Sequence, residues 1–465
     1  MTTTNDTTVK KGIAAYFREA LQSEHQDFTQ GSIRKAVFML AVPMILEMCM
    51  ESVFAIVDIF FVGKLGPGAA ATVGLTESFL MIVYSVAIGL SMAATAMVAR
   101  RVGEKNPDGA AKAGAQSALL AFVLSVIISL IGIFFAEKIL TLMGADAQLV
   151  SMGHRYTRIM LTGNIVIMLL FLINGIFRGA GDATIAMRSL WLANICNIIL
   201  CPLLIHFFGL PGAAMATTTG RGIGVCYQVY RLFKGKGIIK IHTRHFIPDW
   251  SILKSLMNVA VTATMQFLVA SASWMVMARI TADFGSEAVA GYTIAFRWIV
   301  FFLMPAWGLS NAAATLVGQN LGAQQPARAE ESVWKTARYN ALFMTFVSLL
   351  FIVGAEFFVG LINHTDPEVI KTAVTALRII SLGYIFYGVG MVMINAFNGA
   401  GDSRTPTWIN LFWFWIFQIP FAYLLAINLQ MGPKGVFIAI VVTETCVTIS
   451  SVLLFRRGKW KTVKI

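Results

Sequence analysis

Charged residues are scarce in this chain of 465 residues, because Asp, Glu, Lys and Arg together make up only 13% of it. Soluble domains usually carry about 25%. Hydrophobic residues make up 57% of the chain, and they are gathered in runs of about 20–28 residues, enough for a helix to cross a hydrocarbon core about 30 Å thick. The segments between these runs are too short for a soluble domain, so the sequence predicts a protein that acts within a membrane.

Cysteine is also scarce, and all five cysteines fall inside hydrophobic runs rather than in loops. Their spacing is not that of a disulfide framework or of a metal site. Neither a His-Glu-x-x-His motif nor a nucleophile elbow occurs in the sequence. We therefore expect no enzymatic activity and no cofactor.

The hydrophobic runs predict an all-α polytopic membrane protein with twelve transmembrane helices. We expect no cleavable signal peptide, because the residues before the first run are polar, and we expect residues 12–28 to form a short amphipathic helix. The expected spans are residues 36–63, 71–98, 113–136, 156–177, 184–207, 211–232, 252–279, 288–315, 339–361, 372–397, 406–428 and 434–455.

Positive charge is distributed unequally between the two sides of the predicted membrane protein. With a cytoplasmic N-terminus, 26 of the 36 Lys and Arg residues fall in cytoplasmic segments and 6 in outer segments. This bias follows the positive-inside rule and predicts that both termini are cytoplasmic. The net charge of +13 therefore reflects topology and contact with anionic lipid headgroups, and no nucleic-acid partner is expected.

The chain contains an internal repeat with an offset of about 220 residues. Gly-Ala-Gly-Asp at residues 179–182 recurs at residues 399–402, and Gly103 and Gly322 end equivalent spans. Because each half holds six spans, the two repeats are parallel and leave a cleft between them. The expected units are a cytoplasmic N-terminal segment (1–32), an N-terminal six-helix lobe (33–233), a cytoplasmic linker (234–250), a C-terminal six-helix lobe (251–456) and a basic tail (457–465).

The Gly-Ala-Gly-Asp segments are interpreted as tight turns between helices. They lack the Lys-Ser/Thr that follows a phosphate-binding loop. Glycine is expected to supply a positive φ angle, and aspartate to cap the following helix.

Three acidic residues lie on nearly one face of the first predicted span, at Glu47, Glu51 and Asp58. Ionisable residues inside a membrane are costly and are candidates for function. Because the three acids lie at different depths, we expect them to form a relay for protons or a binding site for a cation. The alternative is that they are protonated, or paired with arginine, and only hold helices together.

The fifth and sixth spans supply neutral oxygen atoms that could accompany Asp58. Asn194 and Asn197 share a helix face in the fifth span, and Thr217 lies in the sixth. Asp58, Asn197 and Thr217 could bind Na⁺, or Asp58 could simply carry a proton. Asparagine and threonine are also common in contacts between membrane helices, which is the alternative interpretation.

Two pairs of opposite charges occupy related positions in the repeats. Arg221 and Glu444 are separated by the same interval as Gly212 and Gly435, which open the same two spans. Glu77 and Arg297 are separated by the same interval as the two Gly-Ala-Gly-Asp segments. We predict that both pairs form salt bridges between the lobes, with Glu77 and Arg297 as an outer gate. The alternative is that each charge pairs within its own half or reaches water.

The combination of these motifs resembles the multidrug and toxic compound extrusion (MATE) family over nearly the whole chain. The resemblance is carried by Asp-Phe-Thr-Gln-Gly-Ser-Ile at 27–33, Pro43, the segment Val57–Gly66, Val-Gly-Gln-Asn-Leu-Gly at 317–322 and the two Gly-Ala-Gly-Asp turns. It implies a V-shaped pair of six-helix bundles that exports amphipathic, chiefly cationic, organic compounds in exchange for H⁺ or Na⁺. It also implies a multi-pass protein, which we place in the bacterial inner membrane as a monomer.

Within this family the key acid of the first span corresponds to Asp58, the asparagine of the fifth span to Asn197 and the threonine of the sixth to Thr217. The chain departs from the DinF-like branch, which it otherwise resembles, because Cys201 stands where that branch often has an aspartate. Glu51 is a second departure, and we expect it to replace the missing acid. A lipid-linked oligosaccharide flippase of the same superfamily is the alternative function, although acids in the first span do not suit a pyrophosphate ligand.

Overall fold

The structure is a computed structural model that describes residues 13–22, 27–235, 237–362 and 366–465. Residues 1–12 and 23–26 of the predicted N-terminal segment and residue 236 of the predicted linker lie outside these ranges. The described residues are mainly helical and contain no strand. Helix α1 (Ile13–Gln22) falls within the amphipathic segment that the sequence predicts at 12–28.

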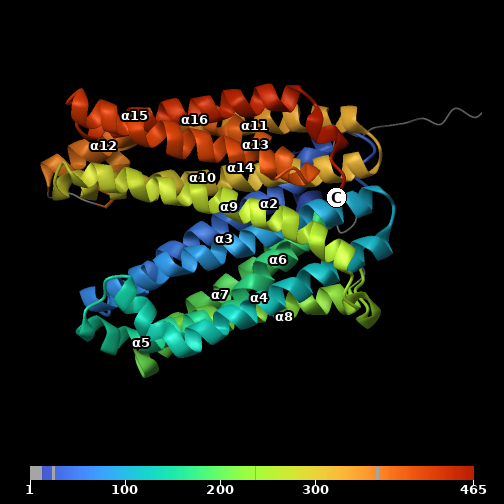
Figure 1. Cartoon of the computed structure of the whole chain (residues 1–465), viewed down its shortest axis with the longest axis horizontal. Helices are drawn as coiled ribbons and strands as arrows, with labels where there is room; N and C mark the ends of the chain where they lie inside the picture. Colours follow the sequence, from blue (N-terminus) through green and yellow to red (C-terminus); the bar gives the residue numbers. More distant parts are fainter. Residues whose placement is uncertain (1–12, 23–26, 236, 363–365) are drawn as a thin grey trace, which may run out of the picture.

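Two helical bundles lie side by side and diverge toward one end of the molecule (Figure 1). We call the first bundle the N lobe. It contains α2 (Ile33–Gly63), α3 (Pro67–Gly103), α4 (Pro107–Leu142), α5 (Ala147–Thr162), α6 (Asn164–Ala180), α7 (Ala183–Phe208) and α8 (Leu210–Lys234). A short 3₁₀ helix, η1 (Thr243–Phe246), lies in the connection to the second bundle.

We call the second bundle the C lobe, and it repeats the order of the first. It contains α9 (Trp250–Ala282), α10 (Ser286–Gly322), α11 (Pro326–Gly360), α12 (Pro367–Ser381), α13 (Tyr384–Ala400), a column made of α14 (Arg404–Asn410), η2 (Leu411–Gln418), α15 (Ile419–Tyr423) and η3 (Leu424–Asn428), and α16 (Pro433–Arg456). The 3₁₀ helix η4 (Lys459–Thr462) follows. The C-terminus lies at the end where the lobes meet, which we call the closed end (Figure 1).

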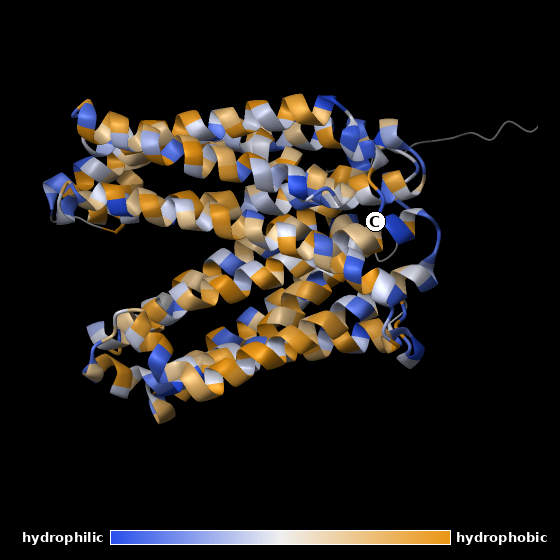
Figure 2. Cartoon of the chain, in the orientation of Figure 1, coloured by the Kyte–Doolittle hydropathy of each residue, from blue (hydrophilic) through white to orange (hydrophobic). Residues whose placement is uncertain are grey.

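The helices have the length and hydropathy of membrane spans. Nine helical segments of the described chain are long and apolar enough to cross a membrane, or ten if the bent pair α12–α13 forms one span. The remaining helices α2 and α8, of 31 and 25 residues, are also long enough and complete the twelve predicted columns. Figure 2 shows hydrophobic residues along the length of both lobes and hydrophilic residues gathered at the two ends.

Each lobe contains one interrupted helix at the same place in the repeat. In the N lobe the chain breaks at Gly163, between α5 and α6, and in the C lobe at Leu382 and Gly383, between α12 and α13. The bend at the second break is 57°. Gly163 and Gly383 are separated by the same interval as the two Gly-Ala-Gly-Asp segments, so the predicted repeat includes these breaks.

The two Gly-Ala-Gly-Asp segments form the predicted turns at the closed end. Gly181 and Gly401 end α6 and α13 with φ angles of 89° and 87°, a left-handed conformation that favours glycine. Asp402 accepts hydrogen bonds from the backbone N–H and hydroxyl of Thr405 in the next helix. Asp182 makes no side-chain cap on α7, so the predicted aspartate cap is absent from the first turn.

At the closed end α3 and α10 cross with almost no space between their backbones. A Cβ atom added to Gly103 would lie 2.0 Å from the carbonyl oxygen of Gln319, and one added to Gly322 would lie 2.1 Å from that of Arg100. The two contacts are equivalent, because Gly103 and Gly322 are separated by the same interval as Arg100 and Gln319. Each lobe therefore uses the same glycine to approach the other.

The side chains beside these glycines bind the turns of the opposite lobe. Gln319 of the C lobe donates a hydrogen bond of 2.9 Å to the carbonyl of Gly179, in the first Gly-Ala-Gly-Asp turn. Arg100 of the N lobe donates one of 3.4 Å to Ala400, in the second turn, and one of 2.9 Å to Val463 in the C-terminal segment. The duplicated turns thus provide acceptors that join the lobes at the closed end.

The segment before α2 also connects the two lobes. Asp27 pairs with Lys105 of the N lobe at 2.5 Å. Partial burial acts to raise the pKa of Asp27, but hydrogen bonds from Lys105 and Thr29 outweigh it and leave that pKa below its ordinary value. On the other side, Arg328 of α11 donates hydrogen bonds to the backbone carbonyls of Phe28, Gln30 and Gly31.

Candidate functional site

A cavity of about 290 Å³ lies between the lobes, and we call it the central cavity. Helices α2, α3, α6 and α7 line its N-lobe side, and α9, α10 and α13 line its C-lobe side. Its lining contains four methionines and four aromatic residues, namely Met48, Met81, Met92, Met304, Tyr84, Phe171, Phe267 and Trp307. Methionine is flexible and aromatic rings are flat, so these walls suit hydrophobic ligands of varied shape.

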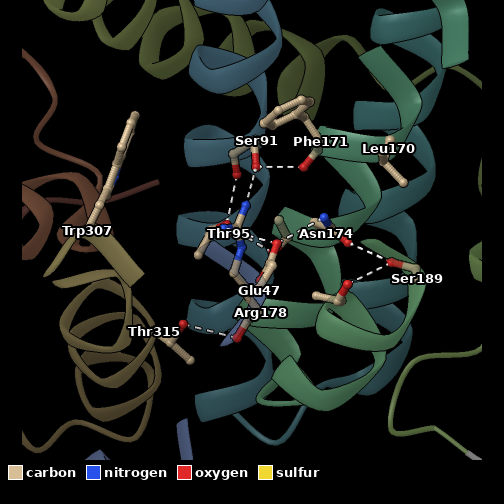
Figure 3. A network of polar contacts seen from close by, with 12 residues as sticks. Glu47, Ser91, Thr95, Leu170, Phe171, Asn174, Arg178, Ser189, Trp307 and Thr315 are labelled. Atoms are coloured by element: carbon tan, nitrogen blue, oxygen red, sulfur yellow. Dashed lines mark hydrogen bonds and ion pairs between the residues drawn. The ribbon is translucent and has the colours of Figure 1, made fainter. Parts of the chain in front are cut away.

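Glu47 lies on the central cavity and has polar partners from α6 (Figure 3). Its side chain is 1% exposed. Its carboxylate accepts a hydrogen bond of 3.0 Å from Asn174 and lies 3.8 Å from the guanidinium of Arg178. A buried carboxylate with these partners is compensated in charge, which supports the interpretation of Glu47 as a paired acid more than that of an open relay.

The polar network around Glu47 extends into three more helices (Figure 3). Arg178 donates a hydrogen bond to Ser91 of α3, at 3.1 Å. The amide oxygen of Asn174 accepts hydrogen bonds from Ser189 of α7 and Gln228 of α8, at 3.1 and 2.5 Å. These bonds connect the cavity wall to the helices behind it.

Arg178 is a site residue that the sequence analysis missed. The sequence predicts that the fourth span ends at residue 177, which places Arg178 among the positive charges of the cytoplasmic turn. Helix α6 instead continues to Ala180, and the Arg178 side chain lines the central cavity with only 11% exposure. Its carbonyl also accepts a hydrogen bond of 3.0 Å from Thr315 of the C lobe.

Glu51 lies one helical turn from Glu47 and pairs with Arg221 of α8. The two side chains approach to 3.1 Å, and Asn194 of α7 donates to the second carboxylate oxygen at 3.3 Å. The Arg221 guanidinium also lies 5.2 Å from the centre of the Phe54 ring, within the range of a cation–π contact. Asn194, which the sequence suggests as a neighbour of Asp58, therefore contacts Glu51.

The predicted salt bridge between Arg221 and Glu444 is wrong, because Arg221 pairs with Glu51 in its own lobe. The two positions are equivalent in the repeats, but α8 and α16 lie on the outer sides of the two lobes, far from each other (Figure 1). Glu444 is buried within the C lobe, and its Oε1 atom has no hydrogen-bond partner in the described structure.

Asp58, Asn197 and Thr217 are all buried in the N lobe. Asn197 donates a hydrogen bond of 2.9 Å to Thr217. One oxygen of Asp58 and the amide oxygen of Asn197 have no partner in the described structure. Asp58 also interacts electrostatically with Arg221 and with Cys201, one turn beyond Asn197 on α7. Free acceptor oxygens of this kind are completed by a proton on the carboxyl group or by a small cation.

Glu77 and Arg297 are both exposed and form no ion pair with each other in the described structure. Glu77 lies on α3 and Arg297 on α10, the two helices that touch at the closed end and diverge toward the other end (Figure 1). Glu77 is near the N-lobe acids, since it interacts electrostatically with Asp58. In this arrangement the predicted outer gate is not closed.

Comparison with known proteins agrees with this architecture. The family model described as MatE matches residues 43–203 and 262–424, one segment in each lobe. The chain is 26% identical over 441 residues to the probable multidrug resistance protein NorM of Thermotoga maritima, covering 92% of this chain and 93% of that protein. It is also 26% identical over 414 residues to the FAD transporter of Shewanella oneidensis, covering 87% and 90%.

A solved structure shares the arrangement of both lobes. It is described as the outward-facing conformation of a multidrug resistance MATE family transporter of the MOP superfamily. The TM-score is 0.89 at 26% sequence identity, and the match covers 94% of this chain and 98% of that one. Together with the matched segments in both lobes, this shows that the chain belongs to the MATE family, whose members are transporters and not enzymes.

Proposed function

We propose that this protein is a secondary antiporter that exports amphipathic, cationic organic compounds by alternating access, driven by inward H⁺ or Na⁺. The observation that supports this most directly is the combination of a hydrophobic cavity between the lobes with an incompletely bonded acid, Asp58, in the N lobe. A ligand in the cavity and a proton or cation at Asp58 would each favour one arrangement of the lobes. Beyond the coupling ion, no cofactor is required.

The closed end faces the cytoplasm in this proposal. It carries the C-terminus (Figure 1), and the distribution of Lys and Arg places both termini on the cytoplasmic side of a bacterial inner membrane. The arrangement described here is then open to the outside. The protein would work as a monomer in contact with membrane lipids, because each chain supplies both walls of its own central cavity.

The coupling ion would bind at Asp58, with Asn197 and Thr217 as its neutral neighbours. Glu51 adjoins this site, where it pairs with Arg221 and accepts a hydrogen bond from Asn194. Glu47 belongs to a separate network, in which it pairs with Arg178. Both H⁺ and Na⁺ are compatible with free oxygens on Asp58 and Asn197. Na⁺ would need further oxygen ligands, since it is bound by several at once.

The alternative of an oligosaccharide flippase has less support. A pyrophosphate ligand requires unpaired Arg or Lys side chains facing the cleft. Arg178 lines the central cavity but pairs with Glu47, and Arg221 behind it pairs with Glu51. Their charges are therefore compensated before any substrate arrives.

Asp58→Asn should abolish gradient-driven transport, because an amide can neither carry the exchanged proton nor supply a carboxylate to Na⁺. Purified protein is reconstituted into vesicles, with Na⁺ and pH gradients imposed independently, and efflux of the cationic dye ethidium is followed. The gradient that drives wild-type efflux identifies the coupling ion. Asp283→Asn, on the exposed end of α9, is the matched control and should transport like wild type. Gradient-driven efflux by Asp58→Asn would refute the coupling role.

Reversing both charges of the outer pair should restore transport that either single reversal impairs. Glu77→Arg places two positive charges on facing helices when the outer end closes, and Arg297→Glu places two negative charges there, so each repels closure. The double variant Glu77→Arg with Arg297→Glu recreates an attractive pair. Ethidium efflux is the measurement, and a double variant no better than the worse single variant would show that these residues do not meet.

A further inference from the structure

Glu444 is an isolated acid in the middle of α16. It is only 7% exposed, and its Oε1 atom has no hydrogen-bond partner in the described structure. The phenol of Tyr387 lies within electrostatic reach of Glu444, but no described Arg or Lys side chain forms an ion pair with it. In this respect Glu444 differs from Glu47 and Glu51, each of which has an arginine partner.

A small cavity adjoins Glu444 inside the C lobe. Its volume is about 10 Å³, close to the smallest cavity volume that can hold one water molecule. Five elements surround it: α9, α10, α12, α13 and α16. The lining residues are Trp274, Ile299, Leu303, Ile380, Gly383, Tyr384, Tyr387, Ile440, Val441 and Glu444.

None of the described residues that line this cavity carries a positive charge. The lining residues from α9, α10 and α12 are Trp, Ile and Leu, and the titratable groups from α13 are the phenols Tyr384 and Tyr387. The hydroxyl of Tyr384 is buried and has no partner in the described structure. The cavity is too small and too poor in oxygen atoms for a hydrated or fully coordinated metal ion. An uncompensated carboxylate at this depth is strongly unfavourable, so a proton is the cation that the site can hold.

The cavity also lies at the break between α12 and α13. Gly383 and Tyr384 line the cavity, and they mark the point where the two helices bend by 57°. A change in this bend would alter the wall of the cavity and the access of water to Glu444. The equivalent position in the N lobe is Arg221, which carries a permanent charge that is already paired with Glu51.

We propose that Glu444 is a second proton-binding site, located in the C lobe and additional to Asp58, which remains the obligatory coupling acid. Glu444 is a neutral carboxylic acid while the cavity is closed, as it is here. When movement at the α12–α13 break admits water, the carboxyl O–H transfers its proton to water and the carboxylate remains; on return it takes up one proton. The part that this exchange plays in transport depends on the proposed antiport, whereas the binding of the proton does not.

Infrared spectroscopy tests whether Glu444 carries a proton. Purified wild-type protein in lipid at neutral pH should show the C=O stretch of a buried protonated carboxyl group, and the difference spectrum against Glu444→Gln should isolate it. Glu444→Asp should shift the frequency of this C=O stretch rather than remove the band. Glu356→Gln, on an exposed acid of the same lobe that pairs with Arg378, is the control and should leave it unchanged. A Glu444→Gln difference spectrum without the component would overturn the proposal.

Transport stoichiometry tests the role of this proton. At a pH difference of one unit and no membrane potential, each exchanged proton changes the limiting ethidium gradient about tenfold. Glu444→Gln should therefore lower that gradient about tenfold relative to wild type and to Glu356→Gln, while H⁺-driven efflux persists. An unchanged gradient would reject a role in transport. Wild-type vesicles without H⁺-driven efflux would instead count against H⁺ antiport, and the infrared result alone would then decide whether Glu444 binds a proton.

Discussion

Gly103→Ala and Gly322→Ala should each shift the protein away from the arrangement in which α3 and α10 touch. The new Cβ atoms would lie 2.0 and 2.1 Å from backbone carbonyl oxygens of Gln319 and Arg100, and backbone cannot move aside as a flexible side chain does. Overpacking of this kind costs about 1–3 kcal/mol. A cost confined to one of two states changes their ratio roughly 5- to 150-fold.

The expected shift is toward states in which the lobes separate at this end of the molecule, because only their separation relieves the clash. It is measured as the distance between spin labels introduced at Lys234 of the N lobe and Ala327 of the C lobe, both exposed in the structure. Labels carried by non-natural amino acids leave the native cysteines intact. The variants should show a longer distance than wild type and slower ethidium efflux.

Gly74→Ala is the matched control for this experiment. Gly74 lies on α3 like Gly103, but a Cβ atom at this position would meet nothing within 4 Å. It should leave both the label distance and efflux unchanged. Because Gly103 and Gly322 make equivalent contacts, both variants must shift in the same direction. Wild-type distances in both would show that these glycines do not control closure.

The same glycines show why the sequence predicts the repeat well. Gly103 and Gly322, and the turns at 179–182 and 399–402, are fixed by backbone geometry: close approach in one case and a positive φ angle in the other. Such requirements allow few residue types, so both copies retain them and the offset is visible. The number of helices and their order follow from that offset and from hydrophobic length.

The partners of the buried charges could not be predicted in the same way. Equivalent residues in two repeats lie at the same depth, but they meet only if their helices run close to the axis that relates the lobes. α3 and α10 do so, and Gly103 and Gly322 contact each other's helices. α8 and α16 do not (Figure 1), and the expected pair of Arg221 with Glu444 does not form.

Arg178 shows a second limit of prediction from the sequence. A residue near the end of a helix is assigned to the loop if the predicted span ends three residues too early. Helical side chains point back toward the N-terminus of their helix, and arginine is long. The Arg178 guanidinium therefore reaches Glu47 in the central cavity from a position that the sequence places in a turn.

Glu51→Gln should destabilise the protein more than the double change Glu51→Gln with Arg221→Met. Removing Glu51 alone leaves the Arg221 guanidinium, only 3% exposed, without its ion-pair partner. Breaking a buried pair in this way costs about 3–5 kcal/mol, whereas replacing both partners by neutral groups is often close to neutral. Methionine at position 221 would pack against Phe54, Tyr84 and Phe171, whose rings surround the guanidinium.

Thermal unfolding of the purified variants measures the difference, and the double-mutant cycle isolates the coupling between the two side chains. The apparent melting temperature should fall by several degrees in Glu51→Gln and recover by at least half in the double variant. A coupling energy below about 0.5 kcal/mol, the limit for independent sites, would show that the pair is structurally unimportant. Glu137→Gln, which removes an exposed acid near Arg158, is the control and should leave stability unchanged.

The same variants decide whether Glu51 compensates for the acid that Cys201 replaces. If it does, Glu51→Gln and the double variant should both lose pH-driven ethidium efflux, although only the single variant is markedly unstable. If Glu51 serves only to neutralise Arg221, the double variant should regain transport together with stability.

Arg221 also lies within electrostatic reach of Asp58. Its fixed positive charge opposes the binding of Na⁺ beside the Asp58 carboxylate more strongly than it opposes protonation, because a proton forms a covalent bond with a carboxyl oxygen. We therefore expect wild-type efflux to follow the pH gradient, and Arg221→Met to increase any response to Na⁺.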